Sequence, residues 1–142
     1  MQRRFTRLAL MLCLSVFFAG VVNAQSAHRF EVEIPFPFVL QGRMLPAGKY
    51  LVQRIDPAKP NVLMLINSEA RIVRLVQTHR VESEKPGTAS VLVFVRREAK
   101  LHLFQIWTGG NKNGNEIPSF DERERRDQYG AETSVVRVRA KT

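Results

Sequence analysis

Short apolar or alternating segments, each bounded by turn-forming residues, constrain the fold of this chain more than any other feature. The separators include Gln41-Gly42, Asp56-Pro57 and Lys85-Pro86-Gly87, and residues of these types favour turns. Segments of this length and composition predict β-strands. The predicted strands cover residues 30–34, 36–40, 50–55, 62–66, 72–81, 91–95 and 101–107.

The connections between these predicted strands are too short to hold crossover helices. Parallel neighbours need a crossover of about a dozen residues or more, whereas antiparallel neighbours need only a tight turn. No helical period fits between any two of the strands, which excludes a parallel α/β sheet. The sequence therefore predicts an all-β fold, a small antiparallel β-sandwich, with a small β-barrel as the alternative.

Residues 1–24 have the order of a secretory signal peptide. Three arginines precede an apolar run over residues 8–22, which is short for a spanning helix of ~20 residues, and Ala24 offers a small side chain at the cut. We expect cleavage after Ala24, export to the periplasm or the extracellular space, and a single β domain over residues 25–142 without a transmembrane segment. An uncleaved anchor is the alternative. Cys13, the one cysteine, lies in the leader, so the domain has no disulfide.

Two prolines and a Leu-Pro-Ala-Gly sequence mark the first part of the domain. Pro35 and Pro37 cannot donate ladder hydrogen bonds, which predicts a sheet edge or a bend, and Phe36 and Phe38 then share one face toward the core. In residues 45–48 proline fixes φ at the second position of a turn, and glycine stands at the fourth position, where it is favoured. This order suits a type I turn. We interpret this stretch as a corner of the fold and not as a catalytic site.

The same stretch, together with the leader and a strand ending in FQIWT, resembles a family of uncharacterised secreted proteins of Acidobacteria and related soil bacteria. Members of that family combine Pro-Phe-x-Phe, a glycine turn and Leu-Pro-Ala-Gly-x-Tyr, and the resemblance covers residues 33–118. It implies an exported β-rich domain. The family has no established reaction or ligand, so the resemblance assigns no site residue. Pro37 and the tail 134–142 depart from the family's pattern.

Three segments follow the last of these strands. Residues 109–118 are rich in glycine and asparagine and are predicted to form a flexible loop. Ser119 and Glu122 make a capping box, so residues 119–129 are predicted to form one short C-terminal helix. Residues 134–139 alternate apolar and basic side chains, which favours an edge strand over a disordered basic tail.

Basic residues outnumber acidic ones, and the formal net charge is +9 at pH 7. This charge attracts anionic surfaces without specifying one of them. Aromatic and arginine side chains are not interleaved as they are on a nucleic-acid-binding face, and export would separate the protein from most nucleic acid. The partners that we expect are anionic or saccharide components of the cell envelope, and no specific nucleic acid.

Residues suited to catalysis are few. His28, His79 and His102 are the side chains that ordinarily titrate near neutral pH. A zinc site needs three or four ligands, Gly-x-Ser-x-Gly does not occur, and no opposed pair of carboxylates stands out. We assign no catalytic residue, no metal ligand and no cofactor. A small hydrolase or metal-dependent enzyme that uses His79 or His102 is kept as an alternative function.

Trp107, Asn111 and Asn113 are the candidate ligand-binding residues. An exposed indole stacks well on a saccharide ring, and the two amides that follow it in the predicted loop would supply hydrogen bonds. The alternative is that Trp107 is buried in the core. The sequence thus predicts an exported, non-catalytic binding or structural module. A lipocalin-like carrier of an apolar ligand is a further alternative, because a barrel can enclose a cavity.

Overall fold

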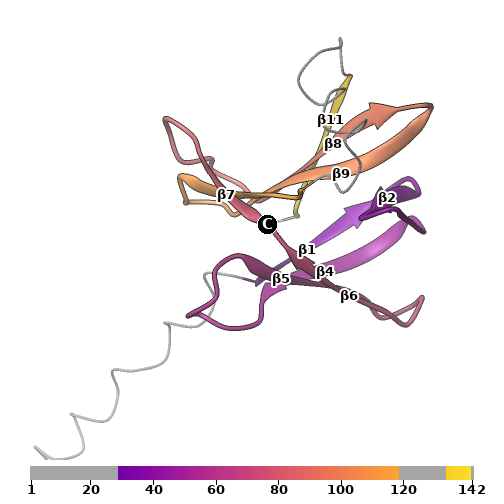
Figure 1. Cartoon of the computed structure of the whole chain (residues 1–142), viewed down its shortest axis with the longest axis horizontal. Coiled ribbons are helices and arrows are strands. Elements are labelled where there is room, and N and C mark those ends of the chain that lie inside the picture. Colours follow the sequence, from indigo (N-terminus) through magenta and orange to yellow (C-terminus); the bar gives the residue numbers. More distant parts are fainter. Residues whose placement is uncertain (1–28, 119–133, 142) are drawn as a thin grey trace, which may run out of the picture.

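The computed structural model describes residues 29–118 and 134–141, and this part of the chain is all-β, as predicted (Figure 1). The predicted leader 1–24, His28 and the predicted helix 119–129 lie outside the described residues. Among the described residues no helix is long and apolar enough to cross a membrane. The strands are β1 (Arg29–Ile34), β2 (Phe38–Leu40), β3 (Arg43–Leu45), β4 (Gly48–Arg54), β5 (Val62–Asn67), β6 (Ile72–Gln77), β7 (His79–Glu82), β8 (Val91–Arg97), β9 (Lys100–Trp107), β10 (Asn113–Glu116) and β11 (Val135–Arg139).

The strands form two sheets that face each other across one core (Figure 1). The smaller sheet has the order β1-β4-β5-β6 and is antiparallel throughout. The larger sheet has the order β11-β8-β9-β10-β7, and β2 pairs with β9 and β3. β2 runs parallel to β9 through the pair Val39 and His102, so the prediction of purely antiparallel sheets is wrong. The reason is that β2 leaves the sheet of β1 and enters the other sheet beside a strand distant in sequence.

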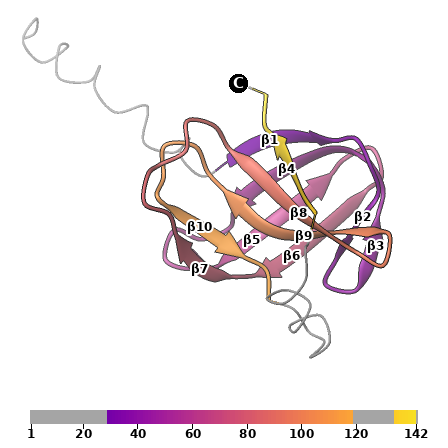
Figure 2. The same cartoon turned by 90° about the horizontal axis from the view of Figure 1, so that it is seen from above.

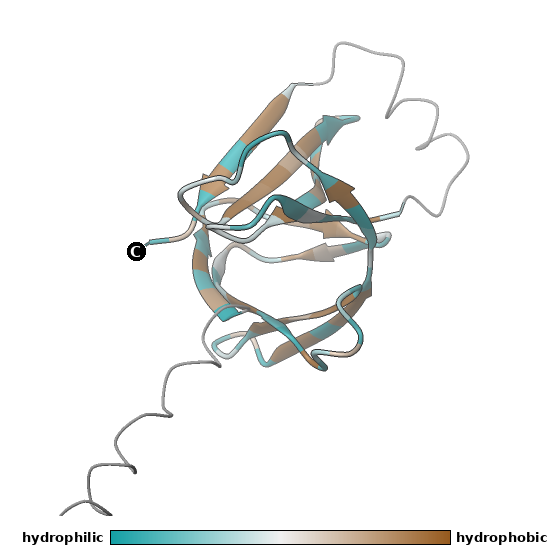
Figure 3. Cartoon of the chain, turned by 90° about the vertical axis from the view of Figure 1, so that its left-hand side faces the viewer, coloured by the Kyte–Doolittle hydropathy of each residue, from teal (hydrophilic) through white to brown (hydrophobic). Residues whose placement is uncertain are grey.

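The described sheets do not close into a barrel. β1 and β6 end the smaller sheet, and β11 and β7 end the path of the larger one. Seen end-on, strands of both sheets curve around a common interior, with hydrophobic stretches along the strands (Figure 3). Of the two predicted architectures the closed barrel is wrong, because no ladder joins these edge strands within the described part of the chain.

Alternating residues of both sheets fill the core. Burial alternates along β1, β4 and β5, which is the period expected of a strand with one face turned inward. β8 is the exception, because four consecutive residues of this strand are buried. The core cluster comprises Val32, Ile34, Phe38, Leu40, Leu45, Tyr50, Val52, Leu63, Leu65, Val76, Leu92, Phe94, Leu103, Ile106 and Ile117.

Four aromatic rings form what we call the aromatic corner: Phe36, Phe38, Tyr50 and Phe94. Phe94 packs edge-to-face against Phe36 and Phe38, with centroid distances of 5.1 and 5.5 Å, and Phe38 packs in the same way against Tyr50 at 5.3 Å. Such pairs add stability beyond the area that they bury. The chain passes from the smaller sheet to the larger one at Pro35-Phe36-Pro37, so the expected bend occurs there.

The Leu-Pro-Ala-Gly sequence returns the chain from β3 in the larger sheet to β4 in the smaller one. The Tyr50 hydroxyl donates a hydrogen bond of 2.8 Å to the Pro46 carbonyl, four residues upstream, as in the tyrosine corners of β-sandwich domains. Gly48 has φ +145, and a Cβ placed on it would lie 2.9 Å from Nδ2 of the buried Asn67. Both the backbone and the space therefore require glycine here.

The predicted strand 72–81 is divided between the two sheets. Its first part, β6, is an edge of the smaller sheet, and its last part belongs to β7 at the edge of the larger sheet. Thr78, between them, is buried, and its backbone N–H donates to the Asn61 carbonyl at 2.8 Å. A continuous β-type pattern cannot reveal such a change of sheet, because the side chains keep alternating through it.

Candidate functional site

Asn113–Glu116 form strand β10 within the segment 109–118 that was predicted to be a flexible loop, so the loop prediction is wrong for residues 113–116. β10 pairs with β9 on one side and with β7 on the other. Asparagine and glycine have low intrinsic β propensity, which is why the sequence indicated a loop. Pairing on both edges supplies the ladder hydrogen bonds that override this propensity.

Trp107 packs on Gly114, its partner in the β9–β10 ladder. A Cβ on Gly114 would lie 2.7 Å from the indole Cδ2 and Cε3 atoms, so only glycine leaves room for the ring. The indole N–H donates to Gln105 Oε1 at 3.1 Å, and Gln105 Nε2 donates to Glu116 Oε2 at 2.9 Å. Trp107 is half-buried and lies outside the core cluster.

Trp107 and the asparagines of β10 lie on opposite faces of the sheet. Ladder partners share a face, so the indole lies on the face where a Gly114 side chain would stand, whereas Asn113 and Asn115 alternate to the other face. A ligand stacked on Trp107 could not reach the Asn113 amide without passing the strand. The single site predicted from Trp107, Asn111 and Asn113 is therefore corrected to two separate places.

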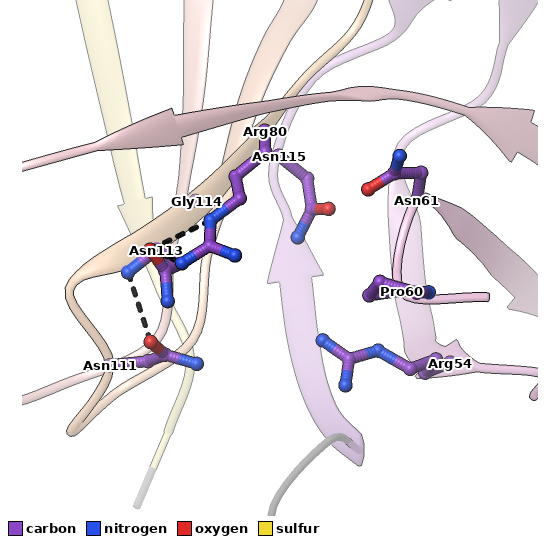
Figure 4. Close-up of a pocket in the computed structure, with 8 residues that line it drawn as sticks. All are labelled: Arg54, Pro60, Asn61, Arg80, Asn111, Asn113, Gly114 and Asn115. Atoms are coloured by element: carbon purple, nitrogen blue, oxygen red, sulfur yellow. Dashed lines mark hydrogen bonds between the residues drawn. The ribbon is translucent and has the colours of Figure 1, made fainter. Parts of the chain in front are cut away.

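A polar pocket of about 200 Å³ lies on the asparagine face (Figure 4). It is formed where the end of β4 and the residues just before β5, in the smaller sheet, meet β7 and β10 of the larger sheet. Two of its lining residues are arginines, four are asparagines, and none is acidic. The lining residues of this arginine–asparagine pocket are Arg54, Pro60, Asn61, Arg80, Asn111, Asn113, Gly114 and Asn115.

Two tight turns position opposite walls of the pocket. The Asp56 carboxylate accepts a hydrogen bond of 2.8 Å from the Ala58 N–H, and this turn leads to Pro60 and Asn61. Across the pocket, the Asn111 Oδ1 atom accepts from the Asn113 N–H at 2.9 Å (Figure 4). Both are Asx turns, which the short polar side chains of aspartate and asparagine form readily.

Hydrogen bonds fix the side chains of β7 and β10 that face the pocket. Arg80 donates to Asn113 Oδ1 from Nε at 3.0 Å and from Nη2 at 2.7 Å (Figure 4). The Thr78 hydroxyl lies 3.0 Å from Asn115 Oδ1 and 3.0 Å from the Asn61 carbonyl, so it links the two walls. These contacts hold the asparagines in place without using an acidic residue.

Arg54, the last residue of β4, extends its guanidinium toward the pocket (Figure 4). Its Nε atom is buried, and within the described part of the chain it has no hydrogen-bond partner. A buried donor without a partner costs free energy, so such groups in folded proteins call for an explanation. No carboxylate lines the pocket to neutralise Arg54 or Arg80.

Two of the three predicted binding residues, Asn111 and Asn113, line this pocket, and Trp107 does not. Sequence reasoning missed the two arginines, Asn61 and Asn115. One signal was present: asparagines recur at every second position in 111, 113 and 115, which is the period of a strand with one polar face.

His79 and His102 do not come together. His79 in β7 lies opposite Glu116 of β10, which lies opposite Gln105 of β9, so the histidines are two strands apart and also three residues apart along β9. With strands ~4.8 Å apart and a rise of ~3.3 Å per residue, this separation is far too large for a shared metal. Among the described residues no group of three or more His, Cys, Asp or Glu side chains could hold a metal ion.

Comparison of the chain with family models, curated proteins and solved structures gives no match. The candidate site therefore has to be interpreted from its own residues.

Proposed function

We propose that this chain is an exported binding module that takes a polar, negatively charged ligand in the arginine–asparagine pocket, and that it performs no catalysis. In this proposal the domain is a small β-sandwich with a short helix over residues 119–129. The leader-like residues 1–24 and the resemblance to secreted proteins support export. Anionic or saccharide components of the cell envelope are the ligands that such a location offers.

The observation that carries the proposal is the excess of hydrogen-bond donors in the pocket. Two guanidinium groups face it, they are always charged, and no carboxylate lines it to balance them. A guanidinium in a partly buried place interacts with an anion more strongly than one in bulk water does. An anionic ligand would supply both the missing charge and a hydrogen-bond acceptor near Arg54.

The lining also favours binding over catalysis. Its residues are Arg, Asn, Pro and Gly, and none of them is an ordinary nucleophile or general base at neutral pH. The enzyme alternative depends on His79 and His102, which lie on different strands and do not converge.

Isothermal titration of the protein purified from the exported fraction tests this function. Inorganic sulfate, phosphate, citrate and uronate oligosaccharides would be titrated beside neutral oligosaccharides of the same length. We expect one or more of the anions to bind, and Arg54→Gln to lower its affinity at least tenfold. Arg43→Gln is the matched control, because Arg43 is exposed on β3 and does not line the pocket.

Two results would contradict the proposal. If Arg54→Gln and Arg43→Gln weaken binding equally, the anion responds to the net charge of the protein and not to the pocket. If no anion binds at low ionic strength, the pocket is not an anion site. N-terminal sequencing tests export separately, and we expect it to read Gln-Ser-Ala-His from Gln25.

A further inference from the structure

The internal hydrogen bonds of the pocket determine which groups it presents to a ligand. Asn113 Oδ1 accepts from Arg80, and Asn111 Oδ1 accepts from the Asn113 backbone N–H. Both partners can only donate, so the amide oxygens must face them. The NH₂ groups of Asn111 and Asn113 are left to donate elsewhere. Acceptor atoms on a ligand would therefore be held by these two asparagines.

The two arginines are not equivalent. Arg80 uses its Nε and Nη2 atoms on Asn113, so this edge of its guanidinium is already occupied. Arg54 makes no such contact with a lining residue, and its guanidinium points toward the asparagines (Figure 4). A guanidinium edge with two free donors matches the two oxygens of a planar carboxylate. The pocket thus has one open place for a bidentate carboxylate, at Arg54.

The size and polarity of the pocket limit the rest of the ligand. About 200 Å³ is below the ~300–1,000 Å³ typical of sites for drug-sized molecules, so the pocket suits a single ring unit. Pro60 is the one apolar side chain in the lining, which disfavours a ligand with a hydrophobic body. A hydroxylated ring would offer oxygen acceptors to the asparagine amides and C–H groups to Pro60.

Resting on the function proposed above, we infer that the ligand is an acidic sugar unit, a uronate, at the end of or within a polysaccharide. Its carboxylate pairs with Arg54, and its hydroxyl or ring oxygens accept from Asn111 and Asn113. An inorganic oxyanion would occupy Arg54 and leave the amides unused. A neutral sugar would use the amides and leave the Arg54 charge unpaired.

Isothermal titration with four matched ligands tests the ligand class: an oligogalacturonate, its methyl ester, a hexose phosphate and inorganic phosphate. We expect the oligogalacturonate to bind at least tenfold more tightly than the other three. The methyl ester lacks the charge, inorganic phosphate lacks the ring oxygens, and the hexose phosphate carries its charge on a larger tetrahedral group in place of a planar carboxylate. If either phosphate binds more tightly than the uronate, this inference is wrong while the anion-binding function stands. If none of the charged ligands binds, both fall.

Three variants separate the two parts of the pocket. Arg54→Gln should remove the preference for the uronate over its methyl ester, so that both bind with similar affinity. Asn111→Ala should weaken both ligands by a similar factor and keep the preference, because the amide contacts sugar oxygens common to the two. Arg43→Gln should change neither. If Arg54→Gln keeps the full preference for the free acid, the carboxylate does not lie at Arg54 and the assignment is overturned.

Discussion

The aromatic corner and the arginine–asparagine pocket are built in opposite ways. In the corner, Phe38, Tyr50 and Phe94 are completely buried, and the Tyr50 hydroxyl has a carbonyl partner. In the pocket, the side chains are asparagines and arginines, and the buried Nε of Arg54 has no partner among the described residues. β2 and β3, which adjoin the corner, lie on the opposite side of the molecule from β7 and β10, which line part of the pocket (Figure 2).

This difference separates residues that stabilise the fold from residues that are available to a ligand. Strand β4 contributes to both regions: it begins at Gly48, beside the corner, and ends at Arg54, in the pocket. Its buried residues Tyr50 and Val52 hold the strand in the core, so Arg54 is presented from a rigid element. Sites on such elements are positioned more precisely than sites on loops.

Removing the central ring of the corner should produce the largest loss of stability. Phe94→Ala deletes a fully buried ring that contacts Phe36 and Phe38, and truncations of this kind cost ~3–5 kcal/mol. Urea unfolding followed by circular dichroism measures the change in the free energy of unfolding. A loss below about 1 kcal/mol would show that the corner can collapse around the gap and is not the rigid part of the fold.

The second largest loss of stability should come from β10, because this strand has Gly114 in close contact with the Trp107 ring. Gly114→Val places a side chain where the Trp107 ring now lies, and overpacking of this kind costs ~1–3 kcal/mol. The emission of Trp107, the one tryptophan in the protein, should shift as the ring is displaced. Gly87→Val is the control, because its nearest atom is at an ordinary 3.6 Å and its φ is not positive.

The bend and the turn of the corner could be predicted from sequence because their determinants are local, whereas the packing of Phe94 from β8 could not. Pro35 and Pro37 exclude regular ladder pairing, and Leu-Pro-Ala-Gly-x-Tyr contains every residue needed for the turn. That Phe36 and Phe38 share one face followed from the alternation of side chains along a strand. By contrast, the parallel contact of β2 with β9 joins residues 63 positions apart, Val39 and His102, and no local pattern specifies such a pairing.

The pocket could be predicted only in part. Asn111 and Asn113 were identified because polar, glycine-rich segments often carry binding residues. Arg54 and Arg80 come from two other strands, and their convergence depends on the change of sheet at Thr78. Trp107 was placed on the wrong side, because a loop at residues 109–118 would have let the asparagines fold back over the indole. Strand β10 fixes them on the opposite face.

Gly48→Val tests whether the corner depends on backbone conformation as well as on aromatic packing. The φ of +145 and the Asn67 amide, 2.9 Å from where a Cβ would stand, both oppose any larger residue, so we expect a loss of about 1 kcal/mol or more. A thermal melt beside Gly87→Val measures it. Equal melting temperatures for the two variants would mean that the turn adapts and that the aromatic rings alone hold this region.

Tyr50 gives the corner a dependence on alkaline pH. Burial raises the pKa of Tyr50 above its ordinary 10.0, and the hydrogen bond with Asn67 opposes this shift. Because the folded state holds the phenol proton more tightly, the stabilisation is complete below pH 10 and is lost as pH rises through the folded-state pKa. Tyr50→Phe should cost ~0.5–1.5 kcal/mol at neutral pH and reduce this alkaline loss. Urea unfolding at pH 7 and above pH 10 tests it, and an unchanged alkaline loss in the variant would contradict the assignment.

The smallest effect on stability should come from Arg54, the pocket residue to which we assign the largest role in the proposed binding. Arg54→Met keeps the aliphatic stem and removes the buried Nε donor that has no partner among the described residues, so the free energy of unfolding should stay within about 0.5 kcal/mol or rise. Anion binding should be lost in the same variant, because Met supplies neither charge nor donor. Urea unfolding and isothermal titration on one preparation measure both quantities. A loss of stability above about 1 kcal/mol would assign Arg54 to the fold, as part of the same rigid framework as the corner, and would remove the contrast between the two regions.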